Sequence, residues 1–275
     1  MDRDFIVNNL VAGVYTHRDK YFKQFTDNWQ NHYANVELIY QVEEGKINEN
    51  MELLRHKFMD KDKRYWLFMD EDILFTRNDV IEKALDCMIK NDLDLVSVYQ
   101  ITDQELANKL GTDNLKFTHL TWVAGYFMLV DSKKSGLIPF DLELPTTHGS
   151  LSDISYSMDI IKNQGLIGMA PTFVYHADEG YSPKISVPFK LNKTNKLSIT
   201  KKAEDFIKNL DKKLLYNNPN LEIILLDNGE IDYNETIGHH YLKNKHADIY
   251  HRVVARPSYY HLKEVKKINT FTNQI

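Results

Sequence analysis

The chain has 275 residues, 43% of them hydrophobic and 27% charged, which is ordinary for a globular protein with one large domain or a main domain and an appendage. Its single cysteine, Cys87, excludes an internal disulfide and any all-cysteine zinc site. No apolar run approaches the length of a membrane span, and residues 1–15 lack the layout of a signal peptide, so we expect a cytoplasmic protein.

The net charge of −5 is unevenly distributed along the chain. Residues 1–180 carry 18 Lys and Arg against 29 Asp and Glu, a net of −11, whereas residues 181–275 carry 16 against 10, a net of +6. This contrast fits an acidic catalytic part with a tail that binds a polyanion. It equally fits a basic tail that complements an acidic body.

Up to about residue 100, predicted strands and helices alternate. The expected strands cover residues 10–15, 36–40, 65–69 and 94–99, and the expected helices between them lie near residues 21–33, 51–58 and 80–89. Alternation at this spacing predicts right-handed βαβ units and a parallel sheet. Ligands of such sheets bind at the carboxyl ends of the strands.

From residue 118 the pattern changes. We expect a strand over residues 118–130 with Gly125 in its middle, and a helix that begins at Ser150 or Ser152. After these the sequence predicts, in order, short strands near 166–169 and 172–176, a helix near 201–215, and a hairpin of 222–226 with 230–233 turned at Asn228-Gly229.

The most informative segment is the apolar run 65–69, which ends in Asp70, Glu71 and Asp72. Side chains alternate along a strand, so Asp70 and Asp72 can share one side while Glu71 points away. Paired carboxylates suit a hard divalent cation such as Mg²⁺ or Mn²⁺, which is often shared with the phosphates of a substrate. The competing interpretation is that the three acids belong to the first turn of a following helix.

Three further features follow the acid pair along the chain. Gly125 lies in an apolar segment, Asp153 stands at the predicted start of a helix, and His176 ends a predicted strand. Each has an ordinary explanation as well, since Asp153 can simply cap its helix and a single histidine is commonly a hydrogen-bonded or surface residue. The tail histidines lack zinc spacing and are predicted to lie on the surface.

In this order, the motifs resemble those of the GT-A glycosyltransferases, which use nucleotide-diphosphate sugars, and the resemblance covers roughly residues 8–180. It implies a Rossmann-like α/β fold with a mixed, mainly parallel sheet. It also implies a catalytic domain over residues 1–180, with residues 181–275 as a smaller basic α+β extension that binds the acceptor. Ser152-Asp153 stands where many members of the family have Glu-Asp.

The resemblance also implies roles for individual residues. Asp72 and His176 would bind Mn²⁺ or Mg²⁺ directly, Asp70 would contact the metal shell or the ribose, and Asp153 would be the catalytic base of an inverting enzyme. The donor nucleotide would be contacted by Thr16, Arg18 and the segment that begins at Gln41.

Several alternatives stay open at this point. The acceptor is a glycan, a lipid-linked glycan or, given the basic tail, DNA that carries a hydroxyl-bearing modified base. A metal-dependent phosphoryl transferase or nuclease also uses paired carboxylates and a histidine. A non-catalytic binding module on the same fold is the third alternative.

Overall fold

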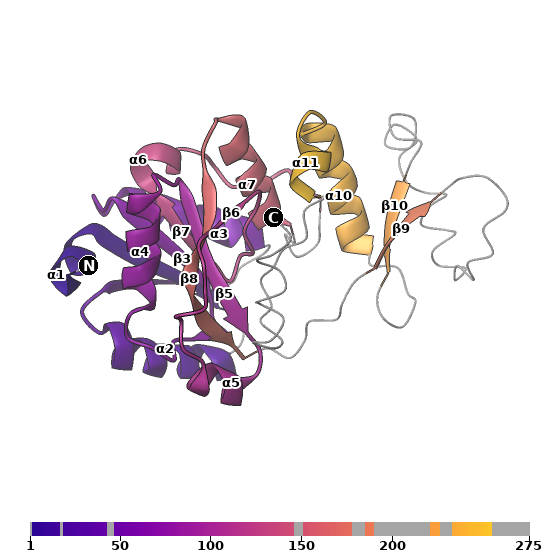
Figure 1. Ribbon diagram of the computed structural model, residues 1–275. Helices are drawn as coiled ribbons and strands as arrows, with labels where there is room; N and C mark the ends of the chain where they lie inside the picture. Colours follow the sequence, from indigo (N-terminus) through magenta and orange to yellow (C-terminus); the bar gives the residue numbers. More distant parts are fainter. Residues whose placement is uncertain are drawn as a thin grey trace.

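The computed structural model describes residues 2–16, 19–42, 47–145, 151–177, 185–189, 221–225 and 233–254. Its centre is an eight-stranded sheet with the order β2-β1-β3-β7-β5-β8-β4, and β6 pairs with β8 (Figure 1). The strands are β1 (Leu10–Thr16), β2 (Glu37–Val42), β3 (Tyr65–Asp70), β4 (Ile73–Leu74), β5 (Leu95–Ile101), β6 (Thr118–Leu120), β7 (Phe127–Asp131) and β8 (Ile167–His176).

Parallel and antiparallel pairs are combined in this sheet. β1 runs parallel to both β2 and β3, and β5 runs parallel to β8. β7 lies antiparallel between β3 and β5, and β4 and β6 pair antiparallel with β8. The predicted α/β fold with a mixed sheet is therefore confirmed.

Helices cover both faces of the sheet. One hydrophobic cluster contains buried side chains of α2 and α4, and a second contains those of α3 and α7. The helices of the main body are α1 (Arg3–Asn9), α2 (Asp19–Tyr33), α3 (Ile47–Met59), α4 (Val80–Lys90), α5 (Gln104–Lys109), α6 (Ser132–Ser135) and α7 (Ser152–Lys162).

The α2 helix shows how helical spacing produces this packing. Phe25, Trp29 and Tyr33 follow one another at intervals of four, so they share one face of the helix. Their ring centroids are 6.1 and 5.4 Å apart in sequence order, and all three side chains are buried against the sheet. The helix predicted near residues 21–33 is confirmed.

Two helices from the C-terminal part pack on α7. Figure 1 shows α10 (Tyr233–Lys245) and α11 (Tyr250–Val254) beside α7, and their buried side chains form a third hydrophobic cluster with residues of α7. The Lys245 ammonium lies 2.8 Å from the Asp141 carboxylate and 3.4 Å from that of Asp159, which adds polar contacts to the apolar ones. None of the described helices is long and apolar enough to cross a membrane.

This packing corrects the prediction for the tail histidines. His246 is fully buried and His240 is 4% exposed, so neither is a surface residue. The reason is that His240 lies in α10 and His246 directly follows it, and this part of the chain packs on α7, which sequence spacing alone does not reveal. His261 lies outside the described residues.

The expected strand over residues 118–130 is wrong in its middle. β6 ends at Leu120 and β7 begins at Phe127, and Gly125 lies in a turn between them. The backbone N–H of Gly125 donates to the Asp153 carboxylate at 2.9 Å, so it is not available to a neighbouring strand.

The two short strands expected near 166–169 and 172–176 are a single strand, β8. Pro171 has no backbone N–H to pair with a neighbouring strand, so from the sequence a strand is expected to end there. In the structure, the pairing with β5 shifts register between Val98 and Tyr99, which accommodates Pro171 and Thr172 without ending the strand.

The predicted hairpin of 222–226 with 230–233 is described only at its two ends, because residues 226–232 lie outside the described residues. β10 (Leu221–Leu225) pairs antiparallel with β9 (Ile185–Phe189), and Tyr233 begins α10 rather than ending a strand. The predicted helix near residues 201–215 lies outside the described residues.

Gly13 in β1 provides a test of the packing between the sheet and α3. A Cβ at this position would lie 2.5 Å from Cζ of Phe58 and 2.9 Å from Cδ2 of Leu54. Phe58 is fully buried between Trp66 and Phe68 and has no room to move. We therefore expect Gly13→Ala to lower the free energy of unfolding by about 1–3 kcal/mol in denaturant titrations.

The matched control is Gly111→Ala, where the nearest atom to the new Cβ is a side-chain oxygen at 3.9 Å. This change should be neutral or slightly stabilising. Equal losses for both variants would contradict the packing described here.

Candidate active site

The carboxyl ends of three neighbouring parallel strands form the edge at which the predicted site lies. Tyr15 of β1 is in register with Gln41 of β2 on one side and with Asp70 of β3 on the other. Thr16 is the last residue of β1 and is 7% exposed. The structure therefore places Thr16, Gln41 and Asp70 at one edge of the sheet. Arg18 lies outside the described residues.

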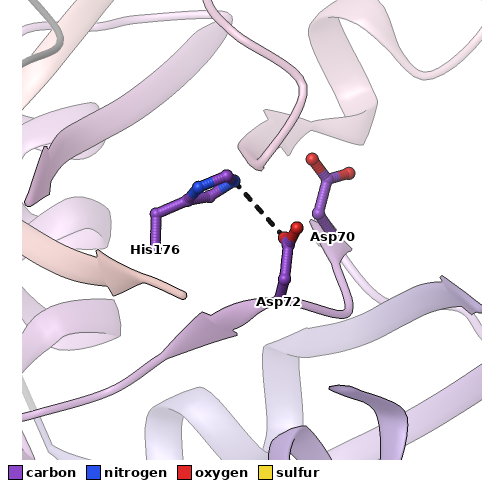
Figure 2. A group of neighbouring side chains, drawn as sticks. All are labelled: Asp70, Asp72 and His176. Carbon is purple, nitrogen blue, oxygen red and sulfur yellow. Dashed lines mark ion pairs between the residues drawn. The ribbon is translucent and has the colours of Figure 1, made fainter. Parts of the chain in front are cut away.

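Asp70, Asp72 and His176 form a compact cluster at this edge. Asp70 ends β3, and Asp72 follows in the turn before β4. The β4–β8 pairing sets Ile73 opposite His176, which brings the imidazole beside the turn. His176 Nε2 lies 3.3 Å from Asp72 Oδ1, and Figure 2 shows the ring and the carboxylate facing each other.

One ligand atom from each of these three residues lies within 4.8 Å of the other two. Carboxylate oxygens are the donors that Mg²⁺ prefers, and an added imidazole is tolerated by first-row ions such as Mn²⁺. The donor set and its spacing therefore fit one divalent cation.

Like charges strain this cluster. Burial and the nearby Asp72 carboxylate raise the pKa of Asp70 to about 7, and a hydrogen bond from Tyr15 partly opposes the rise. The pKa of Tyr15 is itself raised well above its usual value by burial and by the Asp70 charge. A bound cation would favour the charged form of Asp70, because it replaces repulsion by attraction.

Two tyrosines were not predicted as part of the site. Tyr15 hydrogen-bonds Asp70, and the Tyr126 ring packs edge-on against His176 at a centroid distance of 5.9 Å. The backbone carbonyl of Tyr126 also accepts the Asp70 N–H at 3.3 Å. For Tyr15 a signal existed in the sequence, since it is the last residue of the strand predicted over residues 10–15.

Asp153 stands in the first turn of α7, where the helix dipole favours a negative charge. Its Oδ2 accepts the Gly125 N–H at 2.9 Å, and its Oδ1 accepts the Ile154 N–H at 2.8 Å. The Asp153 charge contributes to the raised pKa of Asp70, so the two carboxylates lie close enough to interact electrostatically.

Gln41 already has protein partners. Its side-chain carbonyl accepts a hydrogen bond from Lys57 at 2.8 Å, and its amide donates to the Val42 carbonyl at 2.9 Å. These bonds hold Gln41 at the end of β2. Glu43 and Glu44, which complete the predicted nucleotide-recognition segment, lie outside the described residues.

No protein-family model and no curated protein matches this chain. Similar solved structures include A197 from STIV, with 12% identity, a TM-score of 0.44, and coverage of 61% of this chain and 85% of that chain. The mannosyltransferase PcManGT from Pyrobaculum calidifontis, in complex with GDP-Man and Mn²⁺, has 12% identity, a TM-score of 0.45, and coverage of 63% and 58%. S. aureus TarS 1–349 has 11% identity, a TM-score of 0.45, and coverage of 61% and 60%.

The chain thus spans less than two thirds of the matched PcManGT and TarS chains. Sugar transferases are among the solved structures similar to it, but TM-scores of 0.45 and below carry no weight for function. The assignment of function rests on the side chains at the end of β3.

The raised pKa of Asp70 leads to a prediction about stability in the absence of divalent cations. The unfolded chain loses this proton near pH ~3.9, whereas the folded protein keeps it to about pH 7. Between these values the folded state binds more protons, so stability should fall as pH rises through the window. Asp70→Asn removes this fall, and at pH 8 we expect it to unfold at higher temperature than the wild type, a gain on the order of 1–3 kcal/mol.

The measurement is thermal unfolding of both proteins in chelator at pH 5 and pH 8. Asp60→Asn, in the exposed turn after α3, serves as the control and should track the wild type. If Asp70→Asn were less stable than the wild type at pH 8, the predicted repulsion at this site would be disproved.

Proposed function

We propose that this protein is a metal-dependent glycosyltransferase that moves a sugar from a nucleotide-diphosphate sugar to an acceptor hydroxyl. The observation that supports this best is the placement of Asp70, Asp72 and His176 at the carboxyl edge of the sheet, with the Asp153 carboxylate near enough for its charge to help raise the pKa of Asp70. A cation site and a separate carboxylate are the two elements that this reaction needs: one for the leaving diphosphate and one for the attacking hydroxyl.

In this proposal, Asp72 and His176 hold the cation directly, and Asp70 contacts either the cation or the ribose. The cation is Mn²⁺ or Mg²⁺, and when bound it stabilises the negative charge that grows on the diphosphate as the sugar–phosphate bond breaks. Tyr15 keeps the Asp70 carboxylate oriented through their hydrogen bond.

Asp153 takes the role of general base. As the acceptor oxygen attacks the anomeric carbon, its proton passes to the Asp153 carboxylate. The backbone N–H groups of Gly125 and Ile154 hold that carboxylate in place.

The remaining assignments complete the substrate sites. Thr16, Arg18 and Gln41 contact the nucleotide of the donor, and the donor unit comprises residues 1–180. Residues 181–275 contribute to acceptor binding. Their net charge of +6 suits an anionic acceptor, either a glycan or DNA with a hydroxyl-bearing base.

The metal and donor site can be tested by thermal unfolding with a panel of nucleoside diphosphates and nucleotide sugars, with and without Mn²⁺. One nucleotide should raise the melting temperature only when the metal is present, because a ligand that binds the native state stabilises it by about 2.7 kcal/mol at a hundredfold excess over its Kd. Asp72→Asn should abolish the shift, and the exposed control Asp60→Asn should retain it.

If no member of the panel raised the melting temperature, the proposed transferase activity would be contradicted. Cleavage of a phosphodiester without any sugar donor would then favour the phosphoryl transferase or nuclease. Ligand shifts that persist unchanged in Asp72→Asn would favour a binding module that does not use the metal cluster.

The base can be tested with Asp153→Asn, which keeps an oxygen for the Gly125 N–H but accepts no proton at neutral pH. We expect the turnover number for sugar transfer to fall roughly 10²- to 10⁴-fold. Donor affinity, measured from the metal-dependent melting shift, should stay within about twofold of the wild type. Undiminished turnover would overturn the base assignment and favour a retaining reaction.

A further inference from the structure

The loop of residues 121–126 lies between the two halves of the proposed site. Its first residue follows β6, and its last residue precedes β7, which is antiparallel to β3 and therefore begins at the edge where β3 ends. The loop reaches both Asp153 and the metal cluster, although neither of these belongs to it.

Four residues of this loop are bonded to other elements. The Thr121 hydroxyl donates to the Val253 carbonyl of α11 at 2.9 Å, and the Val123 N–H donates to the Ser157 hydroxyl at 3.2 Å. The Gly125 N–H donates to Asp153 Oδ2 at 2.9 Å, and the Tyr126 carbonyl accepts the Asp70 N–H at 3.3 Å. Because four of its six residues are hydrogen-bonded to other elements, the loop has little freedom to move the Gly125 N–H away from the Asp153 carboxylate.

Ser157 occupies the middle of this arrangement. It is fully buried one turn after Asp153 in α7, so both side chains lie on the same helical face. Its hydroxyl donates to the Asp153 carbonyl at 2.8 Å and accepts the Val123 N–H. A single hydroxyl thus joins the helix turn that carries Asp153 to the loop that orients the Asp153 carboxylate.

We propose that Ser157 is a positioning residue, which holds the 121–126 loop against α7 so that the Gly125 N–H fixes the Asp153 carboxylate in a single orientation. This inference rests on the proposed function, in which Asp153 is the base. Ser157 does not reach the substrate; it acts through Val123 and Gly125.

The test compares Ser157→Ala with Ser155→Ala. Ser155 is also fully buried in α7, but its hydroxyl bonds Asp141 rather than the loop. Both variants lose one buried hydroxyl, so both should melt at lower temperature. Only Ser157→Ala should change the behaviour of Asp153.

The first readout requires no substrate. In ¹⁵N-labelled protein, the Gly125 amide resonance should follow the ionisation of Asp153 because the two are hydrogen-bonded. In Ser157→Ala the midpoint of this titration should move to higher pH. The reason is that the hydrogen bond from the Gly125 N–H, which favours the charged carboxylate, becomes weaker. The Gly125 amide should also exchange with solvent at least tenfold faster.

The second readout is transfer activity. Ser157→Ala should lower kcat roughly 10- to 100-fold with little change in donor KM, and should shift the acid limb of the pH–kcat profile to higher pH. Ser157→Cys keeps the side-chain size and weakens both bonds, so it should show the same changes at smaller amplitude. If the alanine variant does not fold, Ser157→Cys replaces it in both measurements.

A Ser157→Ala protein that melts lower but keeps the wild-type Gly125 titration and amide exchange would overturn the proposal and leave Ser157 a packing residue. The two failures are distinguishable. If the wild type transfers no sugar, the proposed function fails, whereas the amide readout still decides whether Ser157 orients Asp153.

Discussion

The repulsion between two acids at the end of a buried strand is the constraint around which this site is organised. Asp70 and Asp72 lie close enough for Asp72 to help raise the pKa of Asp70 to about 7. The rest of β3 is buried in the middle of the sheet, between β1 and β7, and its packing stabilises a strand end that is unfavourable by itself. A bound divalent cation would relieve that repulsion, because both carboxylates are attracted to it.

The mixed sheet determines which side chains meet at this strand end. β7 runs antiparallel to β3, so β7 begins at the end of the sheet where β3 stops. The loop before β7, with Gly125 and Tyr126, therefore lies at the end of the sheet that carries Asp70. The short β4 pairs antiparallel with the end of β8 and brings His176 to Asp72. Of the two connections, the one through the loop before β7 depends on β7 being antiparallel to β3.

The features of this arrangement that depend on local sequence pattern could be predicted from the sequence. The apolar run before Asp70 predicted a buried strand. The pairing of Asp70 with Asp72 was predicted from alternation along that strand, but β3 ends at Asp70 and the following turn brings Asp72 into the cluster. The position of Gly125 was predicted wrongly, because its N–H is taken by Asp153, a residue 28 positions away in the chain. The partner of β10 and the burial of His246 were missed for the same reason, since each depends on contacts between distant segments. Tyr126 was overlooked because its ring and backbone act on the site through neighbours, without a chemical group that marks it in the sequence.

The central claim is that the end of β3 and the end of β8 hold one divalent cation with a nucleoside diphosphate. The most direct measurement is anomalous diffraction at the manganese edge from crystals grown with Mn²⁺ and the nucleotide that stabilises the protein. The account predicts a single strong peak within bonding distance of an Asp72 oxygen and a His176 nitrogen, in contact with the diphosphate. A nucleotide bound with no peak at these residues, or with its phosphates away from the end of β3, would contradict it.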